Sequence, residues 1–294
     1  MNTAELLRKV RRLEIRSRHL VEDLFAGQSK SVFQGRGMEF EEVRPYLPGD
    51  EVRDIDWNVT ARLGAPYVKR FVEERELTVV LVVDVSRSMR FGTAGGEKRE
   101  LAAELCAVLG FAAVRNDDRV GLVLAGERVE HFVPPARGRS HLLRLLRDVL
   151  GAETEGTAAR LGETARFLMR TARRHSVMFW ISDFEDPVDP RAFQGLARRH
   201  DVTALLLRDP RDEVLPDAGW VELEDLESGA RRLVNTGSRT VRDAYAKAAR
   251  ERLAGVNAAF EKARVPVLEV RTDRSYLPVL MRYFAARRRG RRVA

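Results

Sequence analysis

One carboxylate and two hydroxyls follow an apolar run in the first third of the chain. The run Thr78–Asp84 is almost entirely Val and Leu and ends in Asp84, and Ser86 and Ser88 follow at alternate positions. Apolar residues without polar alternation are typical of a strand buried on both faces of a parallel sheet. Open α/β sheets bind ligands outside the carboxyl ends of such strands. Oxygen donors at this position could bind a hard cation, so a cation site is the first hypothesis.

A second apolar run ends in the same way. Ser182 and Asp183 close the run that contains Trp180 and Ile181, and Asp183 should lie at the same edge of the sheet as Asp84. A threonine of the loop 151–158 could add a hydroxyl. The expected ligands are Asp84, Ser86, Ser88, Thr157 and Asp183, with Thr154 as an alternative to Thr157.

These donors are all oxygens, which favours Mg²⁺, Mn²⁺ or Ca²⁺ over zinc. A purely structural interpretation stays open, in which Ser86 and Ser88 only cap a turn or a helix that begins near Met89.

Alternating strands and helices should position these residues. The pattern predicts an α/β fold with a mostly parallel six-stranded sheet and helices on both faces. Expected strands are 78–84, 119–125, 129–133, 176–182, 201–207 and 265–271. Expected helices are 97–115, 139–150, 159–173, 190–199, 239–263 and 275–287. The gap between 119–125 and 129–133 is too short for a helical crossover, so these two strands should form an antiparallel hairpin at one edge.

The N-terminal part has a different pattern. Helical spacing of apolar residues predicts a helix over 3–25, and frequent Gly and Pro between 32 and 76 predict short strands and tight turns. We therefore expect an accessory region of one helix and a β-rich unit over 1–76, packed closely on a sheet domain over 77–287. A hairpin insertion is expected near 219–235, and a basic tail over 288–294.

The formal net charge of +8 is unevenly distributed. Residues 282–294 carry six Arg and no acidic residue, whereas residues 1–77 are balanced. A short terminal run of this kind is typical of a solvated tail, so nucleic-acid binding is not the favoured function. The chain lacks an apolar run long enough for a membrane span and a signal-peptide core, so we expect a soluble, cytoplasmic protein.

Two sets of motifs resemble known families. Asp84-Val85-Ser86-Arg87-Ser88 with Thr157 and Asp183 resembles the metal-ion-dependent adhesion site (MIDAS) of von Willebrand factor A domains. The accessory region resembles the bacterial DUF58 family, and the motifs are Gly35-Arg36-Gly37-Met38-Glu39-Phe40, Arg44-Pro45-Tyr46, Pro48-Gly49-Asp50, Arg53-Asp54-Ile55-Asp56-Trp57 and Tyr67-Val68-Lys69-Arg70-Phe71.

The resemblance implies a non-enzymatic, chaperone-like module. Such a module binds proteins through a divalent cation and works beside a MoxR-type AAA+ ATPase in the assembly or maturation of other proteins. An unknown client protein would supply an acidic ligand to the cation. Many members of the family carry two N-terminal membrane spans, which are not apparent in this sequence.

Other functions also fit parts of this sequence. A metal-dependent hydrolase or nuclease could use Asp54, Asp56 and Asp183, with the Arg-rich tail on nucleic acid. Asp54 and Asp56 would share one face of a strand, although a fixed salt bridge and turn is the favoured interpretation. The basic residues Arg36, Arg44, Arg53, Lys69 and Arg70 are interleaved with acids, which favours internal ion pairs or a mixed-charge interface over an anion site. A scaffold with an inactive site is the third alternative.

Overall fold

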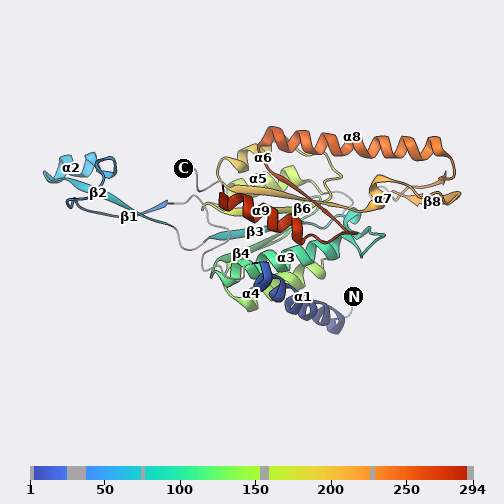
Figure 1. Cartoon of the computed structure of the whole chain (residues 1–294), viewed down its shortest axis with the longest axis horizontal. Helices are drawn as coiled ribbons and strands as arrows, with labels where there is room; N and C mark the ends of the chain where they lie inside the picture. The colour runs from blue at the N-terminus through green and yellow to red at the C-terminus, as the bar shows by residue number, and fades with distance from the viewer. Residues whose placement is uncertain (1–2, 25–37, 74–76, 153–158, 226–228, 290–294) are drawn as a thin grey trace.

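A computed structural model describes residues 3–24, 38–73, 77–152, 159–225 and 229–289. Its body is a six-stranded sheet between two layers of helices (Figure 1). The strands of this sheet are β3 (Thr78–Asp84), β4 (Arg119–Ala125), β5 (Val129–Ala136), β6 (Val177–Ser182), β7 (Asp201–Arg208) and β10 (Val267–Arg271). Their order is β10-β7-β6-β3-β4-β5, and every neighbouring pair is parallel except β4 and β5. The expected sheet, with an antiparallel hairpin at one edge, is confirmed.

Helices cover both faces of the sheet. Val79, Leu81 and Val83 of β3 join the core on one face, and Val80 and Val82 join the core on the other. All five side chains are buried, as expected for a strand with no polar alternation. The first core includes α1 (Thr3–Leu24), α3 (Lys98–Arg115), α4 (Arg139–Leu150) and α9 (Leu277–Arg289), and the second includes α5 (Leu161–Thr171), α6 (Pro190–Ala197) and α8 (Arg239–Ala263).

A second, two-stranded unit lies beyond β7. The strands β8 (Trp220–Glu224) and β9 (Arg231–Asn235) pair antiparallel, which confirms the hairpin expected near 219–235. The short helix α7 (Pro210–Glu213) precedes them and was not expected from the sequence. Asp209 caps the start of α7 in a capping box. Its side chain accepts a hydrogen bond from the backbone at Asp212, and the Asp212 side chain accepts one from the backbone N–H of Asp209.

The accessory region forms an arm. The strands β1 (Met38–Pro45) and β2 (Tyr67–Glu73) pair antiparallel and carry the 3-10 turn η1 (Val52–Asp54) and the helix α2 (Trp57–Leu63). The expectation of strands and turns alone was therefore wrong, because α2 is a helix. Its start is fixed by Asp56, which accepts hydrogen bonds from two backbone N–H groups of the first turn, and its end by Gly64 at a φ of 72°.

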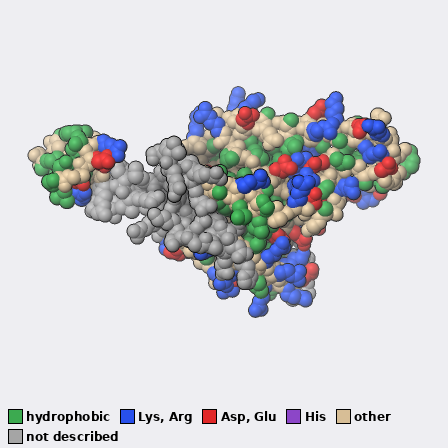
Figure 2. Space-filling model, in the orientation of Figure 1, with side chains coloured by type: hydrophobic (Ala, Val, Ile, Leu, Met, Phe, Trp, Pro, Cys, Tyr) green, Lys and Arg blue, Asp and Glu red, His purple; other side chains and the backbone are tan. Residues whose placement is uncertain are grey.

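The arm projects from the body instead of packing closely on it, which corrects a second expectation (Figure 1). Its tip exposes large apolar side chains, seen as a cluster in Figure 2; these are Leu47, Val52, Trp57 and Leu63. The helix α1 behaves differently, because its buried residues Val10 and Val21 belong to the core of the body. The division of the chain into 1–76, 77–287 and 288–294 stays a prediction. Most of the basic tail lies outside the described residues.

Candidate functional site

Asp84 and Asp183 come together because they end neighbouring parallel strands. Val83 of β3 is in register with Ile181 of β6, so Asp84 and Ser182 follow at the same level of the sheet. The Ser182 hydroxyl donates to Asp84 Oδ2 at 2.6 Å, and the backbone N–H of Phe184 donates to the Ser182 hydroxyl at 2.8 Å. The next residue, Asp183, is 6% exposed. The sheet edge therefore holds two buried carboxyl groups that line one hollow.

The two serines after β3, Ser86 and Ser88, line the same hollow as Asp84. Ser86 N–H donates to Asp84 Oδ1 at 2.8 Å, and the hydroxyl oxygens of Ser86 and Ser88 are 3.1 Å apart. Both residues are buried, and they line one hollow with Asp84, Ser182 and Asp183. Ser86 precedes the 3-10 turn η2 (Arg87–Arg90), yet its side chain makes no capping hydrogen bond. The structural interpretation, in which these hydroxyls only cap a turn, therefore lacks its hydrogen bond at Ser86.

The structure thus brings together four of the five expected ligands, namely Asp84, Ser86, Ser88 and Asp183. The fifth, Thr157, and its alternative Thr154 both lie outside the described residues.

A buried lysine at the site was not expected from the sequence. Lys98, the first residue of α3, is 1% exposed, and its Nζ lies 2.6 Å from Asp183 Oδ2 and 3.3 Å from Asp212 Oδ2. It stands in the charged stretch 97–100, which has the composition of a solvent-exposed helix start. No periodic signal marks it, because only the tertiary fold brings α3 beneath the end of β6.

The charged groups of the site shift one another's pKa values. Burial, and then the negative charge of Asp183, raise the pKa of Asp84 to about 7, against smaller opposing effects of its hydrogen bonds with Ser182 and Ser86. Burial would lower the pKa of Lys98, but the carboxylates of Asp183 and Asp212 outweigh it and raise that pKa above its ordinary value. The lysine therefore remains an ammonium ion.

A third acid lies at the rim of the hollow. Burial, followed by the charge of Asp183, raises the pKa of Glu185 to about 7, although Arg252 lies 3.0 Å from its carboxylate. The negative charges of these acids disfavour one another's ionisation, and a bound cation would favour their ionised forms.

The residues present fit a hard cation. Asp183 Oδ1 is buried and has no hydrogen-bond partner among the described residues, while the two serine hydroxyls share its hollow. Hydroxyl and carboxylate oxygens are the donors that Mg²⁺ and Ca²⁺ take. Within the described ranges no group of three or more His, Cys, Asp or Glu side chains is placed to hold a metal ion, which leaves no His- or Cys-rich alternative there.

A family model with the description "Protein of unknown function DUF58" matches residues 42–254. The chain is also 37% identical over 289 residues to the uncharacterized protein Rv1480 of Mycobacterium tuberculosis, covering 97% of this chain and 91% of that protein. The chain belongs to the DUF58 family. A shorter match, to the uncharacterized protein MAV169 of Mycobacterium avium, is 35% identical and covers 54% of this chain and 95% of the relative.

Solved structures similar to this DUF58 protein include a conserved hypothetical protein, BatB, from Bacteroides thetaiotaomicron. It is 16% identical, with 71% of this chain and 98% of that chain covered and a TM-score of 0.45. The SpRpn10 VWA domain is 12% identical, with coverages of 70% and 94% and a TM-score of 0.40. In the part of the DUF58 chain that the structure describes, no helix combines the length and apolar composition needed to cross a bilayer.

The motif residues that suggested DUF58 stabilise the arm itself. Arg44 donates to both carboxylate oxygens of Asp50, at 2.7 and 2.8 Å, and Lys69 lies 3.4 Å from Asp56. The hydrogen bonds from Arg44 and the Leu47 N–H hold the pKa of Asp50 below its ordinary value. The expectation of internal ion pairs is confirmed for these residues. The side chains of Arg36 and Arg70 lie outside the described part.

The three acids of the hydrolase alternative do not meet in this DUF58 protein. Asp54 lies in the turn η1 and Asp56 caps α2, so the expected shared strand face is wrong. Both belong to the arm, which leads into the amino end of β3, whereas Asp183 follows the carboxyl end of β6. Figure 1 shows the arm on the opposite side of the body from α7, whose Asp212 bonds to Lys98 at the site.

Proposed function

We propose that this DUF58 protein is a non-enzymatic protein-binding module whose binding depends on a divalent cation at the carboxyl edge of the sheet. The observation that carries the proposal is Asp183 Oδ1, a buried carboxylate oxygen with no hydrogen-bond partner among the described residues. The other oxygen, Oδ2, is paired with Lys98 at 2.6 Å. A buried polar atom without a hydrogen-bond partner calls for an ion or a water, and Asp183 lines one hollow with two serine hydroxyls and a second carboxyl group. The cation would be Mg²⁺, with Mn²⁺ and Ca²⁺ as alternatives.

Each residue of the site would have a separate task. Asp84, Ser86, Ser88 and Asp183 would hold the ion, and Thr157 is expected to complete the set. Ser182 and the Ser86 N–H orient the Asp84 carboxylate through their hydrogen bonds. When bound, a divalent cation of this kind offers an open coordination position to an acidic side chain of another protein.

A role without catalysis is favoured by the residue two positions after Asp84. Phosphatases of the haloacid dehalogenase type use an Asp there as acid and base, and this chain has Ser86. The partner is proposed from the family resemblance alone. It would be a MoxR-type AAA+ ATPase acting on a client protein with an acidic ligand, which would place the interaction in the cytoplasm.

Thermal unfolding tests the cation site directly. The wild type and Asp84→Asn are stripped with chelator, and Mg²⁺, Mn²⁺ or Ca²⁺ is restored in excess. Preferential binding to the folded state stabilises it by about 2.7 kcal/mol at a hundredfold excess over Kd, which corresponds to a rise of about 4 °C in Tm for a chain of this length. We expect this rise in the wild type and its loss in Asp84→Asn.

Asp118→Asn is the matched control. Asp118 is also completely buried and accepts a hydrogen bond from the Leu77 N–H at 3.1 Å, but it lies at the amino edge of the sheet. This variant should be less stable than the wild type and still respond to the cation. The proposal fails if no cation raises the Tm of the wild type, or if Asp84→Asn responds as the wild type does.

Capture of the partner is the second test. A purified MoxR-type ATPase is mixed with the wild type, Asp84→Asn or Asp118→Asn, each with Mg²⁺ and with chelator. We expect capture by the wild type and by Asp118→Asn in Mg²⁺ only. Equal capture with and without the cation would contradict a cation-dependent interaction.

A further inference from the structure

Lys98 places a permanent positive charge inside the candidate cation site. Its Nζ lies 2.6 Å from Asp183 Oδ2, and the side chains of both residues are only 2% exposed. The ammonium ion thus takes one oxygen of Asp183 and leaves the other, Oδ1, without a partner among the described residues. A divalent cation at this edge would therefore share Asp183 with a lysine.

The surroundings fix the ammonium ion in this position. The Lys98 N–H donates to the Phe91 carbonyl at 2.9 Å, and Nζ lies 5.6 Å from the centre of the Phe91 ring. On its other side is Asp212, 3.3 Å away, whose carboxylate also accepts the Asp209 N–H at 2.8 Å. Rotation of Lys98 out of the site would leave Asp183 as a buried, unpaired carboxylate, which is costly.

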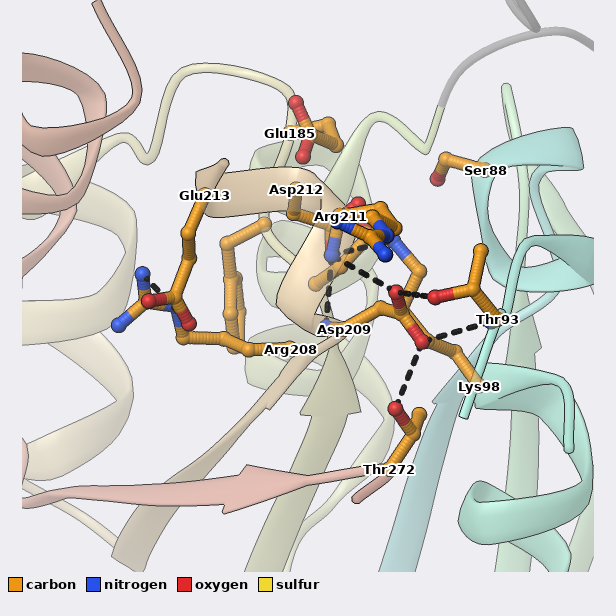
Figure 3. A network of polar contacts seen from close by, with 12 residues as sticks. Ser88, Thr93, Lys98, Glu185, Arg208, Asp209, Arg211, Asp212, Glu213 and Thr272 are labelled. Atoms are coloured by element: carbon orange, nitrogen blue, oxygen red, sulfur yellow. Dashed lines mark hydrogen bonds and ion pairs between the residues drawn. The ribbon is translucent and has the colours of Figure 1, made fainter. Parts of the chain in front are cut away.

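A network around Asp209 holds Asp212 in turn. Asp209 is completely buried and accepts hydrogen bonds from the Thr93 N–H at 2.8 Å, the Thr93 hydroxyl at 2.5 Å and the Thr272 hydroxyl at 2.7 Å. Figure 3 shows both threonine side chains directed at Asp209, with Lys98 next to them. The loop before α3, the end of β7 and the end of β10 are thereby joined beside the site. Lys98 is a built part of the site and not a mobile surface side chain.

We propose that Lys98 is a resident counter-cation that competes with the divalent cation for Asp183 and so weakens its binding. This inference rests on the proposed function, because it concerns the same cation site. Two cations that share one carboxylate repel each other, and this repulsion is strong where water is excluded. Replacement of Lys98 by a neutral residue removes one positive charge from beside Asp183 Oδ2.

The charge also has a consequence for the partner. With Lys98 present, the site that holds a divalent cation is one unit more positive than it would be without the lysine. An acidic side chain of a partner therefore gains attraction from Lys98 as well as from the ion. Lys98 would therefore weaken cation binding in the free protein. When a partner supplies an acidic group, Lys98 would attract that group and so favour the complex of protein, cation and partner.

The test compares the cation response of Lys98→Gln with that of the wild type. Gln removes the charge and keeps a donor for Asp183. In chelator, Lys98→Gln should unfold at a lower temperature than the wild type, since Asp183 loses its counter-charge. With Mg²⁺ restored, its Tm should rise by more than that of the wild type, and its Kd for Mg²⁺ should fall at least tenfold, equivalent to about 1.4 kcal/mol. A lysine with a purely structural role would lower the Tm without increasing the response.

Lys9→Gln is the matched control. Lys9 lies on α1, is about one-third exposed, and pairs with Glu100 of α3 at 2.7 Å. Its replacement changes the net charge by the same amount and leaves the site untouched, so its Kd for Mg²⁺ should equal that of the wild type. Lys98→Arg keeps the charge, and it should not bind Mg²⁺ more tightly than the wild type.

The outcomes separate the two proposals. If the wild type responds to Mg²⁺ and Lys98→Gln responds equally or less, the role of Lys98 is refuted and the cation site stands. If only Lys98→Gln responds, the lysine replaces the divalent cation in the wild type; the proposed function fails and the counter-cation role is supported. If neither responds, both proposals fail.

A measurement on the wild type covers the case in which Lys98→Gln does not fold. The protein is labelled with ¹⁵N-lysine, and the Lys98 ammonium signal is assigned by its loss in Lys98→Arg. Mg²⁺ bound beside Asp183 should shift or broaden this signal and leave that of Lys9 unchanged. A Lys98 signal that is unaffected by saturating Mg²⁺ would overturn the inference.

Discussion

At the scale of single residues, Asp84 is a carboxyl group that the folded protein prefers in its neutral, protonated form. Its pKa rises to about 7, because it is buried and lies near Asp183, whereas in the unfolded chain it is about 4. The folded state therefore binds more protons than the unfolded state between these values, and stability should be lost as the pH rises from about 4 to about 7. Urea unfolding in chelator should show this loss in the wild type relative to Asp84→Asn. A constant difference between the two proteins across this range would contradict the assigned environment of Asp84.

At the scale of elements, one carboxylate joins three segments beside the site. The hydrogen bonds from Thr93 and Thr272 overcome the effect of burial and hold the pKa of Asp209 at about 2. In Asp209→Asn, the side-chain NH2 group would face donors from Thr93 or Thr272, and buried donors would be left unpaired. We therefore expect the free energy of unfolding to fall by about 3 kcal/mol. Asp189 accepts two backbone N–H groups at the start of α6 and is only half-buried. Since Asn also caps helices well, Asp189→Asn should cost less than about 1 kcal/mol. Equal losses in the two variants would refute the special role of Asp209.

At the scale of the whole molecule, the arm lies on the opposite side of the body from α7 (Figure 1), whose Asp212 bonds to Lys98 at the candidate cation site. Trp57 at the tip of the arm is 66% exposed, so Trp57→Ala should change neither the Tm nor the response to Mg²⁺. Phe260 of α8 is completely buried, and its ring contacts Phe184, the residue after Asp183, and Phe193. Phe260→Ala should therefore cost about 3–5 kcal/mol. The urea midpoints of both variants check this, and a large effect of Trp57→Ala would show that the arm contributes to the stability of the body.

Strands with a strong pattern could be predicted closely from the sequence. β3 and β4 begin and end where the apolar runs do, because burial on both faces requires a continuous apolar run. The helices α4 and α8 match their expected ranges, because burial of one stripe leaves a helical period in the sequence. The helix α2 was missed. It is only seven residues long, and its start depends on the cap at Asp56 instead of an apolar period.

The sequence by itself determined that Asp84 and Asp183 lie at one edge of a sheet, since parallel strands of matched register end together. It also determined the spacing that places Ser86 and Ser88 beside them. Only the tertiary structure decided that Lys98 occupies an oxygen of Asp183, and that the acids of the arm lie far from the site. The physical reason is that strand pairing follows from local patterns, whereas a salt bridge between residues 85 positions apart depends on how a helix packs on the finished sheet.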